Sequence, residues 1–202
     1  MRRLVLVCVL LMLALNMTVL AQDNVNGQWA VGFNGSGGIP TGDFKNLSDF
    51  GFGGSGWVGY MVDPYFTLTG KVGYLRFSGK DYNLSIQGTA VAASTTYSIV
   101  PITVGGRYFF SQGDSHVYGS AEAGLYLLNT NIDIKATGNN AYFSGSGSSS
   151  ESKFGVAPTL GIQFKAGDNM NVDVHGNYTA VFTSGSTLSW IGFGVGLEFA
   201  LK

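Results

Sequence analysis

The chain has 202 residues and a formal net charge of −1, and only 11% of its residues are charged, against roughly 25% in soluble domains. With no basic run and with 13% aromatic residues, it is typical of neither a nucleic-acid-binding protein nor a disordered chain. We therefore expect no nucleic-acid partner, and we expect an outer surface that meets lipid.

Residues 1–21 have the pattern of a cleaved secretory signal peptide. Arg2 and Arg3 supply a positive start, Leu4 to Leu15 form an apolar run, and Val19-Leu20-Ala21 resembles a cleavage site. A retained membrane anchor is the alternative, but the run is short for a span of about 20 residues. We expect cleavage and secretion through the inner membrane.

The remaining residues, 22–202, predict one domain that begins at Gln22. Cys8 is the only cysteine and lies in the signal segment, so we expect no disulfide or thiol chemistry after cleavage. No later stretch is long and apolar enough for a transmembrane helix, so any crossing of a membrane must use strands. Because the chain ends at Lys202, we also expect no wall-binding domain after this one.

Eight segments of the domain alternate large apolar side chains with small or polar ones, the period-two pattern of β-strands. In chain order they cover about 28–37, 50–62, 65–77, 97–110, 116–129, 153–165, 170–183 and 189–201. The last segment is the clearest example. Its large apolar side chains are Ile191, Phe193, Val195, Leu197, Phe199 and Leu201, with glycine, Glu198 and Ala200 between them.

The connections between these segments alternate in length. Those after the second, fourth and sixth segments are tight, whereas the others include long polar stretches near 38–49, 78–95 and 130–152. The serine- and glycine-rich run 137–152 cannot bury enough apolar area to order itself, which predicts a mobile loop. Antiparallel strands joined in this way place all the tight turns at one end of the structure.

The distribution of charge distinguishes lipid from water as the environment of the apolar face. Arg76 is the only charge on the apolar faces of all eight segments, and it lies at a strand end. A Lys or Arg at the middle of a bilayer costs roughly 2–4 kcal/mol. Aromatic residues also gather near both strand ends, as in interfacial girdles. The sequence therefore predicts an all-β, eight-stranded antiparallel up-and-down transmembrane β-barrel, with a soluble β-sandwich or lipocalin-like barrel as the alternative.

The opposite, inward face carries the charges, and an eight-stranded barrel is just wide enough to be filled by side chains. Buried charges need partners, so we predict a structural polar network in the lumen, made by Lys71, Arg107, Glu122, Asp173, His175 and Glu198. A gated polar path is the alternative, and the many inward glycines are its main support. Asp173 and His175 could orient a general base or bind a metal ion, but no third partner stands at an informative spacing. We therefore expect no catalytic, metal or cofactor site.

Specific motifs connect the chain with a known family. Gly38-Ile39-Pro40-Thr41-Gly42-Asp43-Phe44 follows the first segment, and glycine–aromatic strand endings recur as Gly59-Tyr60, Gly73-Tyr74 and Gly161-Ile-Gln-Phe164. On these residues the chain resembles the small eight-stranded outer-membrane β-barrels of the OmpA, OmpX and opacity-protein type.

The resemblance implies a location in the bacterial outer membrane, with membrane lipid, lipopolysaccharide and the outer-membrane assembly machinery as partners. It also implies a non-enzymatic role in envelope structure or in surface interaction through external loops, which could bind an extracellular ligand. A narrow passive channel for small or hydrophobic solutes is the alternative. A lipid-modifying enzyme is a weaker one, because the hydrolases of this fold carry a His-x-Ser pair and here His175 is followed by Gly176 and Asn177.

Overall fold

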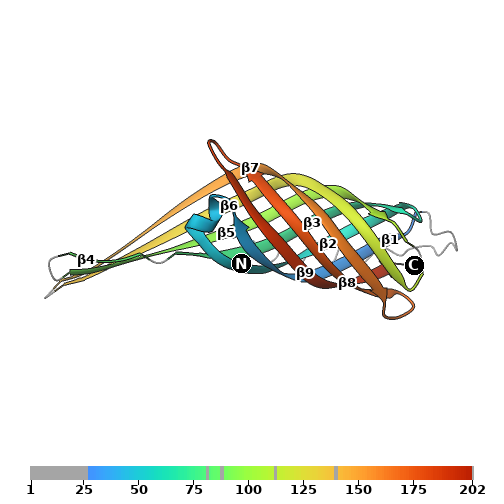
Figure 1. Ribbon diagram of the computed structural model, residues 1–202, viewed down its shortest axis with the longest axis horizontal. Coiled ribbons are helices and arrows are strands. Elements are labelled where there is room, and N and C mark those ends of the chain that lie inside the picture. Colours follow the sequence, from blue (N-terminus) through green and yellow to red (C-terminus); the bar gives the residue numbers. More distant parts are fainter. Residues whose placement is uncertain (1–26, 81, 87–88, 112, 139–140, 202) are drawn as a thin grey trace, which may run out of the picture.

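A computed structural model of the chain describes residues 27–80, 82–86, 89–111, 113–138 and 141–201 (Figure 1). The predicted signal peptide, residues 1–21, lies outside this part. The strands are β1 Trp29–Thr41, β2 Ser48–Asp63, β3 Phe66–Gly79, β4 Tyr82–Ile86, β5 Thr89–Phe109, β6 Ser115–Gly138, β7 Ala141–Lys165, β8 Met170–Phe182 and β9 Thr187–Leu201. A four-residue helix, α2 Phe44–Leu47, separates β1 from β2. In the described ranges no helix is long and apolar enough to cross a membrane.

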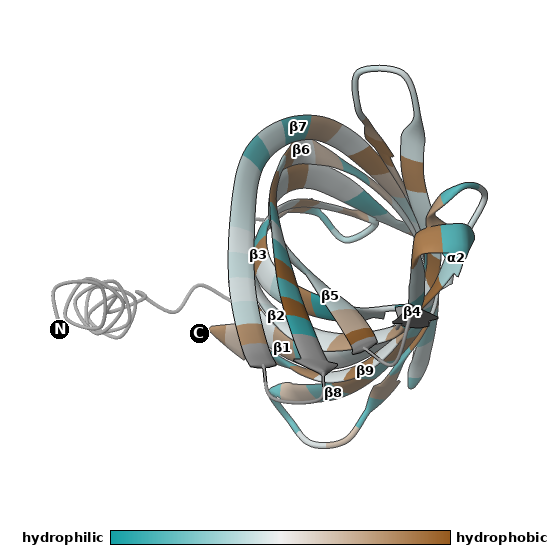
Figure 2. Ribbon diagram, turned by 90° about the vertical axis from the view of Figure 1, so that its left-hand side faces the viewer, coloured by the Kyte–Doolittle hydropathy of each residue, from teal (hydrophilic) through white to brown (hydrophobic). Residues whose placement is uncertain are grey.

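The strands form a closed ring in which every pairing is antiparallel (Figure 2). Apart from β3 and β4, neighbours in sequence pair with each other, and the ring closes between β1 and β9, from Trp29↔Leu201 to Thr41↔Ser189. β3 and β4 both pair with β5, one after the other, and β4 pairs only with 89–93, beyond the ring, so the ring itself has eight strands. Closure removes the unpaired edges that an open sheet would leave. The predicted eight-stranded antiparallel barrel is confirmed.

Side chains alternate across the wall as the period of two requires. Val104 points outward and is 70% exposed, whereas its neighbour Thr103 is buried in the barrel. Large apolar residues therefore cover the outside of the ring. Aromatic rings meet on this outer face, where Phe154 of β7 stacks on Phe182 of β8 with ring centroids 6.4 Å apart.

Glycines on the inward face make room for large side chains of the neighbouring strand. A Cβ added at Gly161 would overlap the Tyr118 ring, and one added at Gly194 would lie 2.6 Å from the His175 ring. Since such close approach requires the absence of a side chain, these glycines allow the lumen to be filled. The glycine content, which was the main support for a channel, thus has a different structural reason.

Beyond one end of the ring, the chain forms strands where the sequence predicted loops. The stretch 78–95, expected as a polar loop, contains β4 and the start of β5, paired from Tyr82↔Ala93 to Ile86↔Thr89. The run 137–152, expected as a mobile loop, belongs to β6 and β7, which stay paired as far as Gly138↔Ala141. The loop predictions for 78–95 and 130–152 are therefore wrong. β1 also runs on to Thr41, so that the connection predicted at 38–49 is shorter and contains α2.

The physical reason for this extension is the continuity of the ladder. A separate hairpin must close its loop and set its register at a cost in entropy, whereas strands leaving a barrel are already held in register. Each further residue then gains backbone hydrogen bonds without needing a buried core. We call this region, made of β4 with 89–98 of β5, 129–138 of β6 and 141–150 of β7, the projecting sheet (Figure 1).

Candidate functional site

The half of the lumen near the tight turns is filled by ion pairs. Lys71 of β3 pairs with Glu122 of β6, and Thr103 Oγ1 donates a hydrogen bond to Glu122 Oε2 at 3.1 Å. Arg107 of β5 spans the barrel to Glu198 of β9, with 2.9 Å between Nη1 and Oε2. Only β5 separates β3 from β6, whereas β5 and β9 lie far apart in the ring, so the Arg107–Glu198 pair could not be read from the sequence pattern alone.

Arg107 is the central side chain of this half. Gln163 Nε2 donates to the same carboxylate oxygen of Glu198 that Arg107 contacts. The guanidinium carbon lies 4.4 Å from the centre of the Trp57 ring and 4.3 Å from that of Tyr118. A cation between aromatic faces is attracted by their electron-rich surfaces, so the buried charge has both an ion-pair partner and an aromatic cage.

The last two predicted residues form a pair of their own on β8. His175 Nδ1 lies 2.5 Å from Asp173 Oδ1. The structure thus joins the six sequence-predicted residues as three pairs on the inward face, rather than as one continuous chain of charges. In the described part of the chain, no group of three or more His, Cys, Asp and Glu side chains is arranged to hold a metal ion.

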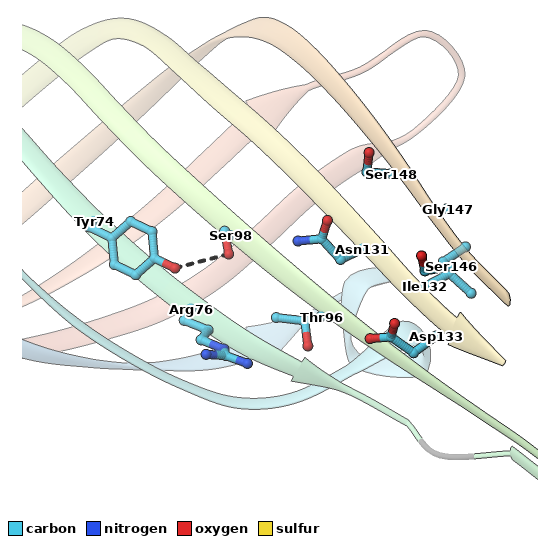
Figure 3. Close-up of a pocket in the computed structure, with 10 residues that line it drawn as sticks. All are labelled: Tyr74, Arg76, Thr96, Ser98, Asn131, Ile132, Asp133, Ser146, Gly147 and Ser148. Atoms are coloured by element: carbon cyan, nitrogen blue, oxygen red, sulfur yellow. Dashed lines mark hydrogen bonds between the residues drawn. The ribbon is translucent and has the colours of Figure 1, made fainter. Parts of the chain in front are cut away.

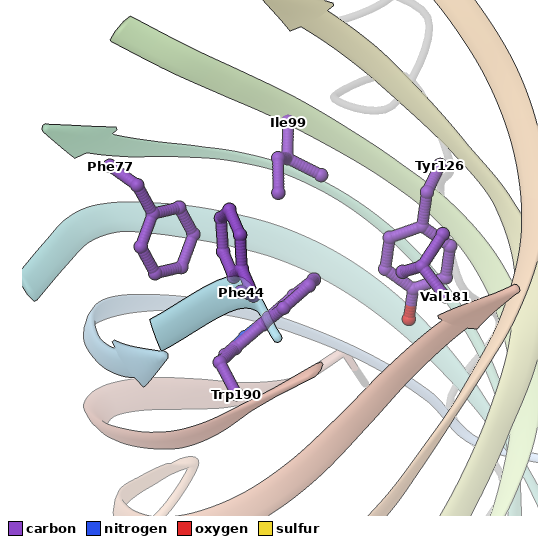
Figure 4. Packing of buried hydrophobic residues seen from close by; sticks show 6 residues of the cluster. All are labelled: Phe44, Phe77, Ile99, Tyr126, Val181 and Trp190. Carbon is purple, nitrogen blue, oxygen red and sulfur yellow. The ribbon is translucent and has the colours of Figure 1, made fainter. Parts of the chain in front are cut away.

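The half of the lumen near the projecting sheet is filled by aromatic and aliphatic side chains (Figure 4). Phe44 of α2 points into the mouth of the barrel, 5.1 Å from the Phe77 ring and 6.4 Å from the Trp190 ring between centroids. We call this group the aromatic plug. Its buried members are Phe44, Phe77, Ile99, Tyr126, Val181 and Trp190.

Sequence reasoning missed the aromatic plug because it searched the inward face for charges only. Phe77, Tyr126 and Trp190 all stand at positions that alternate with outward residues, so the period of two already placed them inside. Phe44 had no such signal, because its position depends on how α2 folds over the rim.

The part of the lumen that the structure describes contains small cavities. One, of about 50 Å³, lies between Lys71, Tyr126 and Trp190, and another, of about 30 Å³, lies below it beside Arg107. Thr69 Oγ1, Arg107 Nε and Asp173 Oδ2 border the smaller cavity and are buried without a hydrogen-bond partner among the described atoms. A buried water needs about 10–15 Å³ and two or more polar partners, so each cavity has room for only a few waters.

Comparison with known proteins identifies the family. The sequence from residue 7 to residue 199 matches the model of the outer membrane protein beta-barrel domain. The chain belongs to this family. Membership places it in the bacterial outer membrane, and it confirms the resemblance drawn from the sequence. Because such barrels have tight turns at the periplasmic side and longer connections outside, the projecting sheet is assigned to the cell exterior.

Solved structures of other outer-membrane proteins are similar in fold. Ail, the attachment invasion locus protein of Yersinia pestis, solved in complex with the heparin analogue sucrose octasulfate, is 16% identical with a TM-score of 0.52, over 87% of this chain and 99% of Ail. A major outer membrane protein from Thermus thermophilus is 11% identical with a TM-score of 0.52, over 86% of this chain and 99% of that one.

The outer membrane protease OmpT from Escherichia coli is 9% identical with a TM-score of 0.46, over 91% of this chain and 99% of OmpT. Likeness at these identities shows the fold alone. The comparison with curated protein sequences gives no match.

Proposed function

We propose that this protein is a non-enzymatic, non-conducting outer-membrane barrel that holds the projecting sheet outside the cell for interaction with other surfaces. The proposal rests on the contrast between the filled barrel and the projecting sheet. The lumen is filled at two successive levels, by ion pairs and by the aromatic plug, while the longest strands of the chain extend beyond it.

The projecting sheet has features of a surface for recognition. β7 pairs with β6 along its whole length, but its ladder with β8 begins only at Gly155↔Val181. Residues 141–154 of β7 therefore present backbone donors and acceptors along an open edge, which is a template for an added strand. Loops and extensions on a rigid scaffold are where binding function concentrates. Ail, similar in fold, has a name that refers to attachment.

The proposal also includes the sequence-based predictions about the inward charges, the signal peptide and membrane insertion. The six inward charges act as a structural network and not as the lining of a path. Export uses cleavage of residues 1–21, and insertion uses the outer-membrane assembly machinery, which would recognise the alternating last strand, β9.

The test uses two measurements on the chain from Gln22 and on a variant in which residues 80–94 and 131–148 are each replaced by an Asn-Gly turn. In planar bilayers we expect no steady ion conductance from either protein. On the surface of a heterologous didermic bacterium, we expect the full chain to increase cell–cell aggregation or retention on a matrix-protein coating, and the shortened chain to do neither. Steady conductance, or equal adhesion by both chains, would contradict the proposal.

A further inference from the structure

The projecting sheet has two faces of different chemistry. Its outward face is polar, and the residues that line a hollow of about 520 Å³ there include Arg76, Asn131 and Asp133, together with Ser and Thr hydroxyls of β5 and β7 (Figure 3). The other face continues the lumen side of the wall, because the ladders of β6 with β5 and with β7 run from the wall into the projecting sheet without a shift in register. We call this second surface the inner face.

The inner face is apolar and exposed. Leu128 of β6 packs against the aromatic plug, so Ile132 and Ile134, four and six positions further along the same strand, lie on the inner face. These two side chains are 42% and 41% exposed. Phe143 of β7 lies on the same face, two positions from the Gly145 that stands opposite Ile134, and it is 65% exposed. A contiguous apolar patch that meets water marks a surface that binds another molecule.

The shape of the inner face suits a second copy of itself. Ile132 and Ile134 form a ridge on β6, and opposite Ile132 stands Gly147 of β7, where an added Cβ would meet nothing within 4 Å. On the β5 side, the residue opposite Ile134 is Ala93, which is also small. A ridge with a furrow beside it is complementary to itself, because a two-fold rotation places the ridge of each copy over a furrow of the other.

The charge of the inner face also favours an identical partner. The inner-face positions whose side chains the structure describes are 91, 93, 95 and 97 of β5, 130, 132 and 134 of β6, and 143, 145, 147 and 149 of β7, and none of them is charged. A charged surface would repel an identical one, whereas two uncharged apolar surfaces gain free energy when they bury each other. The inner face also lacks the charges by which a surface selects a different protein.

The area of the inner face is near the lower limit for a specific interface. Its parts of β5, β6 and β7 are each about ten residues long at about 3.3 Å per residue and lie about 4.8 Å apart, so they cover about 500 Å². Two copies would together bury about 1,000 Å², which is the least that a specific protein–protein interface requires. One such contact is weak, but many copies on each of two facing surfaces act together.

The position of the inner face determines which copies can meet there. Because it continues the lumen side of the wall, the inner face borders the space above the mouth of its own barrel (Figure 1). Two sheets that pack face to face lie about 10 Å apart, so two barrels in one membrane would overlap if their inner faces were in contact. A copy in a facing membrane enters the same space from the opposite side and has its barrel there.

We propose that the inner face binds the inner face of a second copy of this chain in a facing membrane, so that the two projecting sheets pack against each other. Ile132 and Ile134 of each copy are buried in this contact. The inference rests on the proposed function, and it makes the partner of the projecting sheet the same protein. The open edge of β7 is not used in this contact.

The experiment measures aggregation of phospholipid vesicles, labelled in two colours, into which the refolded chain from Gln22 has been inserted. The vesicles contain no lipopolysaccharide and no other protein. We expect vesicles that bear the chain to aggregate with each other and not with empty vesicles, because each contact needs a copy of the chain on both sides.

Two double variants test the inner face. Ile132→Ser combined with Ile134→Ser should slow aggregation about tenfold or more, because both copies lose their large apolar side chains from every contact. Asp133→Ser combined with Lys135→Ser is the matched control, because these residues lie on the outward face of the same strand and their charges cancel. We expect the control to change the rate by less than about twofold, in line with exposed charges at a surface.

Aggregation with empty vesicles would overturn the proposal, since it would show binding to lipid, and so would equal rates for the two double variants. Vesicles of the parent chain that stay dispersed would overturn it as well. If cells with the full chain still adhere more than cells with the shortened chain, the partner is then a different molecule and the proposed function stands. If they do not, the proposed function fails too. Heat-modifiable migration in SDS gels checks that each variant is folded.

Discussion

The barrel wall and the projecting sheet are built from the same strands, yet their residues differ in kind. Within the wall, β7 carries Phe154 and Leu160 on its outward face, and in the projecting sheet the same face of the same strand carries Ser146 and Ser148. The backbone pairing does not change along the strand, so the difference in residue type reflects the environment of the side chains. Large apolar residues mark where lipid lies outside the strand, and small polar ones mark where both faces meet water.

The two regions should also differ in how they respond to substitution. Side chains inside the barrel are buried and packed from several strands, whereas in the projecting sheet Ile134 and Phe143 are exposed and a Cβ added at Gly147 would meet open space. Changes inside the barrel should therefore alter stability, and matched changes in the projecting sheet should alter it little. Four substitutions or deletions test this contrast, and all are read from reversible unfolding in urea in the presence of lipid vesicles.

The largest effect is expected from Glu198→Ala. It removes the partner of Arg107 and leaves a buried cation unpaired, which should lower the free energy of unfolding by about 3–5 kcal/mol. The control is Glu151→Ala, at a side chain that is 57% exposed and that pairs with Lys153 beside the projecting sheet. An exposed pair contributes only about 0–1 kcal/mol. Equal losses in the two variants would show that the inward charges are not a buried network.

Phe44→Ala should have the next largest effect. It removes the ring that closes the aromatic plug, and buried Phe→Ala changes cost about 3–5 kcal/mol. We expect about 3 kcal/mol, because water can enter the mouth and fill part of the space. Phe143→Ala is the control in the projecting sheet, where the ring is 65% exposed, and it should change stability by less than about 0.5 kcal/mol.

Phe44→Ala also tests the two levels of filling separately. Because the ion pairs lie below the aromatic plug, we expect no steady conductance in planar bilayers from this variant. Conductance from the single substitution would mean that the aromatic plug alone closes the lumen.

A smaller loss is expected from Gly161→Ala. The new methyl group would overlap the Tyr118 ring, and overpacking of this kind costs about 1–3 kcal/mol. Gly147→Ala provides the control on the same strand, because nothing lies within 4 Å of a Cβ added at Gly147 in the projecting sheet. A neutral Gly161→Ala would indicate that the inward glycines do not make room for their neighbours.

The smallest effect on the barrel is expected from the largest change in sequence. Replacement of 80–94 and 131–148 by two-residue turns removes most of the projecting sheet but keeps the register of the wall. Since doubling the length of a loop changes its closure free energy by only about 0.6 kcal/mol, the barrel should lose about 1 kcal/mol or less. A loss comparable with that of Glu198→Ala would show that the projecting sheet helps to hold the wall together.

Several features of the structure followed from the sequence. The alternation of residues predicted the strands of the wall, and the restriction of charge to one face predicted which side meets lipid. The same alternation placed Lys71, Arg107 and Glu198 inside the barrel. These predictions succeeded because a strand exposes its side chains to two sides in turn, so that the pattern records the environment of each face directly.

The partners of those side chains could not be predicted in the same way. Arg107 and Glu198 are 91 residues apart in the chain and meet only because the ring closes between β1 and β9. The sequence placed these charges on one face of their strands but gave no distances across the lumen, so it predicted a network without its pairs. The position of Phe44 likewise depends on the short helix that folds over the rim.

The sequence by itself determined where the chain meets lipid. Because it is costly to place a charge in hydrocarbon, charged residues are nearly absent from the lipid-facing side of the strands. It left the projecting sheet undetermined, because serine and glycine in water are compatible with either a loop or a strand. The tertiary structure decided that question. Strands already aligned by the barrel continue to pair at little cost in entropy, and this order is not encoded in the local composition.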